Sequence, residues 1–231
     1  MISKTHKTIF VHIPKVAGQS IETMFLEDLN LDWYNRGELL LRKKKATEKG
    51  PYRLAHLKAH EYVDLNYLTK EDFEAYFKFS FVRNPFSRAY SYYKYLGYSK
   101  VCTYNYFLKN VLEKKIKNRH FFFISQTDYL YNSDNKLLVD FVGKFENLNE
   151  DIKTVIKSSN LKTETLPFVN KSKSEVKRSI SKVIKNPLFL ANLNTNNPIF
   201  KDYREAYDDK SKNIVNKLYK NDLENFQYEF E

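Results

Sequence analysis

Two stretches of the chain share one pattern, in which alternating apolar residues lead through a short turn into apolar residues at helical spacing. Residues 7–13, "KTIFVHI", read as a buried strand, and residues 17–29, "AGQSIETMFLEDL", read as the helix that follows. Further on, "KFSFVR" (78–83) is strand-like, and "PFSRAYSYYKYL" (85–96) is helical with Pro85 at its first position. Two such strand–turn–helix motifs predict an α/β fold with a parallel sheet, with ligands at the carboxyl ends of its strands.

The remaining segments are weaker in pattern. Thr69 is the expected N-cap of a short helix that leads into the second strand. The segment from Leu31 to Lys49 is expected to be a surface connection with some helix. The other predicted elements are a helix at 105–116, a short strand or buried segment at 120–125, a strand, turn and helix within 136–159, a helical period within 173–185 and a late helix within 202–226.

Length and composition fit one domain over residues 1–231. The chain has 42% hydrophobic and 16% aromatic residues, enough for a sizeable core, and we find neither a linker nor a repeat. The single cysteine, Cys102, cannot form an internal disulfide. There is no leader-like apolar segment and no apolar run near the roughly 20 residues that span a bilayer. We therefore expect a soluble, cytoplasmic protein.

The formal net charge of +11 is compatible with nucleic acid, an anionic membrane, a polyanionic glycan or a highly charged nucleotide as partner. Part of this charge lies in two clusters, Arg42 to Lys45 and Lys114 to Arg119. Such clusters are commonly solvated lysine-rich faces. Charge alone does not choose among these partners.

The first turn, Pro14 to Ser20, has the composition of an anion site. Small residues at Ala17 and Gly18 permit close approach, Ser20 offers a hydroxyl at the helix start, and Lys15 adds a positive charge. Neither the dinucleotide fingerprint nor the Gly-Lys-Ser ending of a triphosphate loop is present. An ordinary turn with a surface lysine remains the alternative.

The second turn adds Arg83 at the end of a strand, and Ser91 follows on the helix with Arg88 between them. A guanidinium fork suits a phosphate monoester. The alternative is an arginine that caps a loop and a serine that is merely exposed. Taken together, two phosphate sites on adjacent strands would suit a ligand with phosphates at both its 3′ and 5′ positions.

These residues resemble the PAPS-dependent sulfotransferases, in the branch of the carbohydrate O-sulfotransferases and their bacterial relatives. "HIPKVAGQS" looks like the 5′-phosphosulfate loop of that family, usually His-Ile-Pro-Lys-Thr-Gly/Ala-Gly-Thr-Ser, and "FSFVRNPFSRAYSYY" looks like its 3′-phosphate motif. Later segments, "LLVDFVGKFENLNEDI", "LPFVNKS" and "DYREAYDD", are similar too. The resemblance implies a three-layer P-loop-like fold with a central parallel sheet flanked by helices. It also implies PAPS as sulfuryl donor, no metal, and a hydroxyl-bearing acceptor, most simply a glycan.

The resemblance also implies roles for individual residues. Lys15 would contact the oxygen that bridges the sulfuryl group and the 5′-phosphate, and Arg83 and Ser91 would bind the 3′-phosphate. The 5′-phosphate would be held by the loop, namely Pro14, Lys15, Ala17, Gly18, Gln19 and Ser20. The chain departs from the family pattern at Val16 and Gln19, which replace threonines, and in a possible insertion at about 173–201.

A base for the acceptor hydroxyl is expected in "RLAHLKAHEY", where a histidine serves in the resembling family. His56 fits that context best, with His60 and Glu61 as the alternatives. His12 is expected to set the loop.

Two other functions remain open from the residues. One is a small-molecule kinase with a variant P-loop. The other is a nonenzymatic basic binder of nucleic acid or glycan, although the sulfotransferase prediction expects no nucleic acid. Oligomeric state is open.

Overall fold

The computed structural model describes residues 1–167, 169 and 198–231. The chain divides into two compact units, each described here by itself: the first is Met1–Arg83 with Ser125–Val169, and the second is Asn84–Ile124 with Asn170–Glu231. Most of the predicted insertion at 173–201 and all of the helical period at 173–185 lie outside the described residues.

The first unit contains a four-stranded sheet in the order β1–β2–β3–β4. The strands are β1 (Ile2–Ser3), β2 (Thr8–Phe10), β3 (Phe77–Val82) and β4 (Phe141–Lys144). β2 pairs parallel with β3, and β3 pairs parallel with β4. The predicted α/β class with a mostly parallel sheet is confirmed. β1 was not predicted: it pairs antiparallel with β2, because a turn closed by Lys7 N–H to Lys4 C=O at 3.2 Å folds it back.

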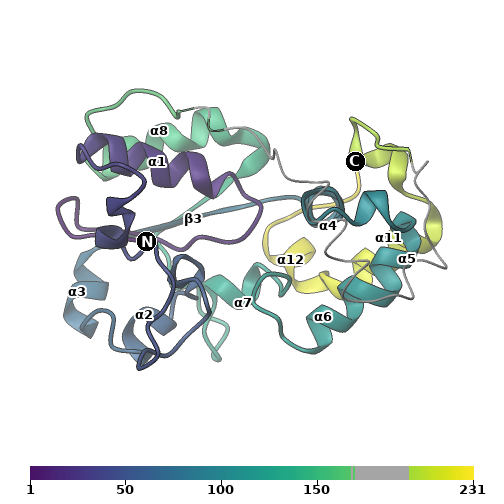
Figure 1. The fold of residues 1–231 in the computed structure, drawn as a ribbon, viewed down its shortest axis with the longest axis horizontal. Coiled ribbons are helices and arrows are strands. Elements are labelled where there is room, and N and C mark those ends of the chain that lie inside the picture. Colours follow the sequence, from purple (N-terminus) through teal and green to yellow (C-terminus); the bar gives the residue numbers. More distant parts are fainter. Residues whose placement is uncertain (168, 170–197) are drawn as a thin grey trace. The chain divides into compact units, whose positions relative to one another are not determined.

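Helices flank this sheet on both faces (Figure 1). α1 (Gly18–Asp28) and α8 (Leu148–Ser158) cover one face, and α2 (Glu61–Asp64) and α3 (Lys70–Ala75) cover the other. The short helix α7 (Thr127–Leu130) belongs to the same unit. Stacked phenylalanines join sheet and helix: the ring of Phe79 lies 4.9 Å from that of Phe10 and 6.1 Å from that of Phe25. All three side chains are fully buried.

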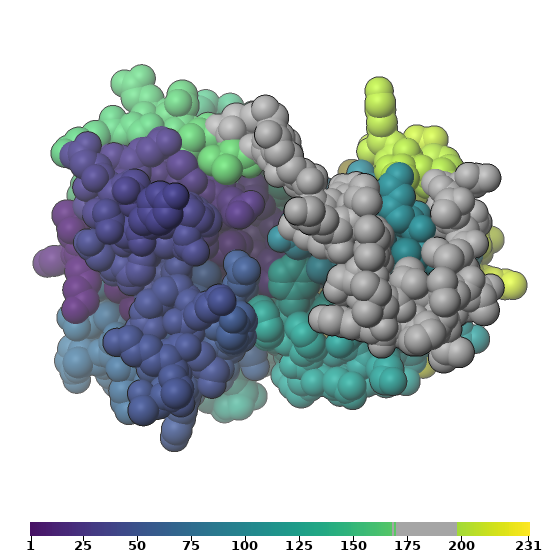
Figure 2. All heavy atoms as spheres, in the orientation of Figure 1, coloured from purple at the N-terminus to yellow at the C-terminus, as the bar shows by residue number. Residues whose placement is uncertain are grey.

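The connections of the first unit follow the sequence pattern. The surface connection expected at 31–49 contains one 3₁₀ turn, η1 (Asn35–Leu39), and two further 3₁₀ turns are η2 (Leu54–His56) and η5 (Phe145–Asn147). Thr69 is the N-cap of α3, as predicted, because its side chain accepts a hydrogen bond from Asp72 N–H. In the space-filling view, the dark-blue segment after α1 lies on the visible surface of this unit (Figure 2).

The second unit is helical. Its elements are α4 (Pro85–Tyr95), η3 (Tyr98–Lys100), α5 (Tyr104–Phe107), a π-helical turn η4 (Leu108–Leu112), α6 (Glu113–Lys117), η6 (Tyr203–Ala206), α11 (Asp209–Leu218) and α12 (Lys220–Asn225). They enclose a core rich in tyrosine and phenylalanine that also holds Cys102. At 120–125 the chain forms turns rather than a strand, and Phe123 and Ile124 are buried there. The buried-segment alternative is therefore the right one.

Within the described ranges, no helix is both long enough and apolar enough to cross a membrane.

Candidate functional site

The turn between β2 and α1 has an unusual backbone. Lys15 and Ala17 adopt positive φ angles of 76° and 63°, although each carries a Cβ. Backbone that alternates in this way turns successive N–H groups toward one side and forms an anion-binding concavity. The N–H groups of Gly18 and Gln19 open α1, where the first residues of a helix have no partner within it. The predicted phosphate loop thus has the backbone form that an anion needs.

Gly18 is required by a side chain of the chain itself. A Cβ at this position would come within 1.9 Å of His12 Nε2, so the imidazole ring fills the space that any other residue would use. His12 is held there because its Nδ1 lies 2.5 Å from Glu22 Oε1, and both side chains are nearly fully buried. The expectation that His12 sets the loop fits this packing. Glu22 has a part that sequence reasoning missed, although its spacing of one helical turn from Gly18 was a usable signal.

Ser20 and Gln19 occupy the first turn of α1. Gln19 is exposed and Ser20 half-buried. Ser20 N–H donates to Ala17 C=O at 3.0 Å, and Ser20 Oγ accepts from Val169 N–H at 3.4 Å. The Ser20 N–H is therefore engaged within the turn, which leaves the amides before it as the better anion donors.

His56 lies beside this turn in the first unit. It ends η2, is 8% exposed, and its Nδ1 lies 2.9 Å from the His12 carbonyl oxygen. A carbonyl only accepts hydrogen bonds, so Nδ1 carries the proton and Nε2 carries the lone pair of the neutral ring. Burial, with the nearby charges of His12 and Arg53, lowers the pKa of His56 well below its usual value of 6.5. The ring is therefore neutral at physiological pH and able to accept a proton at Nε2.

The other candidate bases have different surroundings. His60 is on the surface, where its Nδ1 lies 2.8 Å from Asp64 Oδ2. Glu61 accepts from Lys58 N–H at 2.8 Å at the start of α2. Of these candidates, only His56 contacts the backbone that leads into the turn.

Arg83 joins the second motif to the first. It follows β3, and its Nη1 lies 3.4 Å from the Lys15 carbonyl oxygen. The guanidinium lies over the Phe145 ring at 4.1 Å. Lys15 and Arg83 are both half-buried. The first unit thus brings two predicted cofactor-binding residues together, one from each strand–turn–helix motif.

Gln126 fixes the backbone of Arg83. Its side-chain amide accepts from Arg83 N–H at 2.9 Å and donates to Arg83 C=O at 2.8 Å, and the residue is fully buried. Gln126 and Phe145 were not found from the sequence. Gln126 stands directly after an apolar run, and a lone amide in such a place is a weak signal.

Ser91 and Arg88 lie on α4 in the second unit. Ser91 is half-buried. Arg88 is fully buried, where it donates to Ile124 C=O at 3.1 Å and lies 3.9 Å from Asp222 Oδ2. Arg88 therefore holds the core of that unit together. Because Arg83 and Ser91 belong to different units, the predicted 3′-phosphate pair stays a prediction.

Among the described residues, no group of three or more His, Cys, Asp or Glu side chains could hold a metal ion.

Comparison with known sequences decides the family. The sequence model of the sulfotransferase family matches residues 1–229, nearly the whole chain. The chain belongs to the sulfotransferase family. The resemblance drawn from the two turns is thereby confirmed, and membership supports sulfuryl transfer as the general activity.

A relative of this sulfotransferase occurs in Archaeoglobus fulgidus under the name "Uncharacterized protein". The two are 33% identical over 118 residues, which is 50% of this chain and 93% of the relative. No solved structure matches the chain.

Proposed function

We propose that this sulfotransferase moves a sulfuryl group from PAPS to a hydroxyl of a carbohydrate acceptor. The observation that carries the proposal is the contact of Arg83 Nη1 with the Lys15 carbonyl, 3.4 Å away. It links a left-handed turn at a helix start to the cation that follows the neighbouring parallel strand. Such an edge is where open α/β sheets bind phosphate-bearing ligands.

The residues fit the donor by their chemistry. Amides of Ala17, Gly18 and Gln19 would hold the 5′-phosphate, with Pro14 shaping the turn and Ser20 beside it. Arg83, and Ser91 from α4, would hold the 3′-phosphate. A family match from residue 1 to 229 supports treating both units as one domain with a three-layer, P-loop-like architecture.

The chemical step needs a base and a stabilised leaving group. The acceptor oxygen forms a bond to sulfur while the bond from sulfur to the bridging phosphate oxygen breaks. His56 Nε2 takes the hydroxyl proton, and the leaving PAP keeps the electron pair of the broken bond. The Lys15 ammonium stabilises the charge that grows on that oxygen.

The test is transfer of labelled sulfate from PAPS to a panel of glycans, with Lys15→Ala as the variant. We expect the transfer rate to fall by roughly 100-fold or more, since one charge-stabilising group in an active site is worth about that much. Lys157→Ala, an exposed lysine on α8, is the control and should transfer at the wild-type rate.

A melting experiment separates binding from chemistry. PAP should raise the melting temperature of the protein because it binds the folded state. If neither PAP nor PAPS changes the melting temperature, and Lys15→Ala transfers no less than Lys157→Ala, the proposal is wrong.

A further inference from the structure

A basic hairpin lies between η1 and α2 in the first unit. Lys43 and Arg53 pair across an isolated antiparallel bridge. Two backbone hydrogen bonds flank it: Lys44 N–H to Tyr52 C=O at 3.1 Å and Leu54 N–H to Arg42 C=O at 3.0 Å. We refer to residues 42–54 as the basic hairpin. Its pairing fixes Lys43 and Arg53 opposite each other.

The charge of the basic hairpin is one-sided. It holds six basic residues and one acidic residue, Glu48. Glu48 is engaged by Arg42, whose two terminal nitrogens lie 2.7 and 2.6 Å from its carboxylate oxygens. Within the described ranges, neither Lys43 nor Arg53 forms an ion pair with a carboxylate. Like charges directly opposite in a strand pair are destabilising, so this pair lowers stability unless an anion lies between them.

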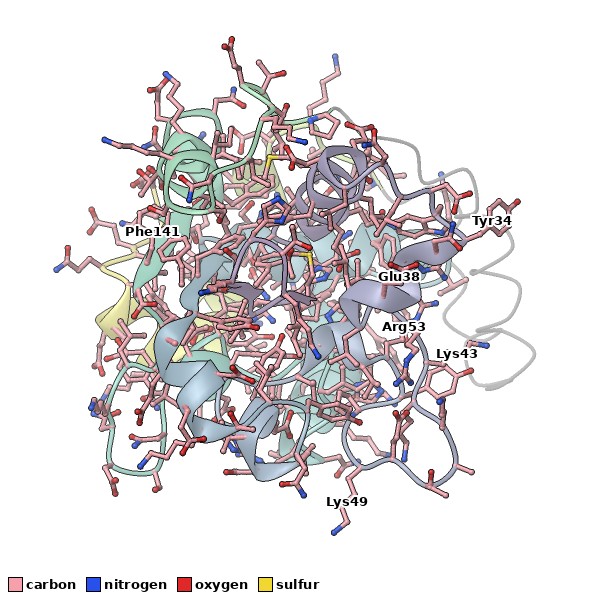
Figure 3. The ribbon with its side chains drawn as sticks, turned by 90° about the vertical axis from the view of Figure 1, so that its left-hand side faces the viewer. Tyr34, Glu38, Lys43, Lys49, Arg53 and Phe141 are labelled. Atoms are coloured by element: carbon pink, nitrogen blue, oxygen red, sulfur yellow. The ribbon has the colours of Figure 1, made fainter. Side chains whose placement is uncertain are left out.

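Exposed aromatic rings accompany these cations. Tyr52 is 55% exposed, and Lys43 Nζ lies 5.3 Å from its ring centroid. Tyr34, before η1, is 93% exposed. Figure 3 shows Tyr34, Lys43 and Arg53 on one side of the molecule, whereas Lys49 points away from them. Flat aromatic faces next to cations suit an acidic sugar, whose ring can stack while its carboxylate is bound.

The basic hairpin leads directly to the proposed base. Arg53 precedes η2, and His56 N–H donates to the Arg53 carbonyl at 3.1 Å. One 3₁₀ turn thus separates the cation from the histidine. The charge of Arg53 also contributes to the lowered pKa of His56. A sugar bound at Arg53 would therefore lie next to the residue that must take its proton.

We propose that Lys43 and Arg53 bind the carboxylate of an acidic sugar in the acceptor glycan, with Tyr52 stacking on a sugar ring. The inference rests on the proposed function, which leaves the class of glycan open. It makes the acceptor a uronic-acid-containing polysaccharide and the basic hairpin its binding surface.

The test measures binding to the full chain by calorimetry at fixed salt. The probe is a hexasaccharide of alternating glucuronate and N-acetylglucosamine, and the neutral probe is a hexamer of N-acetylglucosamine. We expect Lys43→Ala and Arg53→Gln each to weaken the acidic probe about tenfold, the value of one charge-assisted hydrogen bond. Lys49→Ala removes one charge from the same hairpin and should change binding less than twofold at this salt. The neutral probe should bind far more weakly to every variant.

Three results together identify the cause. Lys43→Ala should melt no lower than wild type, since it relieves a like-charge pair, so weaker binding would not reflect misfolding. PAP binding should be unchanged in Lys43→Ala and Arg53→Gln. If Lys49→Ala weakens the acidic probe as much as Lys43→Ala does, or if the neutral probe binds as tightly as the acidic one, the inference is overturned. Failure of wild-type protein to bind PAP would instead overturn the proposed function, and the binding of the acidic probe would still be readable.

Discussion

Single residues in the turn after β2 carry a conformational cost. Lys15 and Ala17 have φ angles in the left-handed region, where an L-residue with a Cβ loses roughly 1–2 kcal/mol. Such conformations persist where the surrounding structure fixes them, and they concentrate at ligand sites. In this turn the stretched-out cost is accompanied by a directed set of N–H groups, which is what an anion requires.

Ala17→Gly should stabilise the protein. Glycine removes the Cβ conflict at φ 63°, while the greater freedom of the unfolded chain offsets part of the gain. We expect the free energy of unfolding to rise by up to about 1 kcal/mol, measured by urea denaturation. Ala75→Gly, in the exposed face of α3, is the matched control and should lower it by about 0.5–1 kcal/mol. A loss of stability in both variants would contradict the strain argument.

His56 should make stability depend on pH on the acid side. Its pKa in the folded protein lies well below 6.5, so below that pH the unfolded chain binds a proton that the folded chain does not. Stability therefore falls as the pH drops below 6.5, with a slope of up to about 1.4 kcal/mol per pH unit from this group.

The measurement is urea denaturation between about pH 7 and pH 5. His56→Gln should reduce the slope, whereas His60→Gln, which removes an exposed histidine, should keep the contribution of His56. An unchanged slope in His56→Gln would show that the ring is not buried in its neutral form. In the labelled-PAPS assay, His56→Gln should also lose most of the transfer rate, whereas His60→Gln should keep it.

At the scale of elements, helix starts were easier to recognise than short strands. Thr69 and Pro85 signalled the starts of α3 and α4 correctly, because capping depends on neighbours in sequence. β1 was missed, since a strand of two residues has no period of its own and exists only through its pairing with β2. The expected strand at 120–125 failed for the opposite reason: an apolar run was buried without a strand to pair with.

Asp208 should contribute to α11 as its cap. Its side chain accepts from Ser211 N–H at 2.8 Å, and Ser211 Oγ accepts from Asp208 N–H at 2.8 Å, a capping box. Asp208→Ala should lower the free energy of unfolding by about 1 kcal/mol near neutral pH. Asp209→Ala, whose side chain is 98% exposed, is the control and should cost much less.

The effect of the Asp208 cap should depend on pH. The hydrogen bonds from Ser211 and Asn105 lower the pKa of Asp208 to about 2, below its unfolded value. The charged cap is therefore fully present above about pH 4 and is lost as the pH falls toward 2. The stability difference between Asp208→Ala and wild type should narrow over that range, and a constant difference would contradict the role of the charge.

At the scale of the whole molecule, the sequence predicted what is local and missed what is not. The two strand–turn–helix motifs, with Lys15 and Arg83 at their turns, follow from spacing within a few residues. The pairing of Gln126 with Arg83 joins residues 43 positions apart, and that of His56 with His12 spans 44. Such contacts arise only when β2 and β3 lie side by side, so periodicity in one sequence carries no trace of them.

The packing of His12 against Gly18 has a consequence for how this sequence can change over evolutionary time. Because the imidazole occupies the space of a Cβ at position 18, neither site can be exchanged independently. A lineage that gains a side chain at position 18 must first or simultaneously reduce the one at position 12, and would then release Glu22 from its partner. These three positions should vary together or not at all, so their joint identity marks relatives that share this form of the loop.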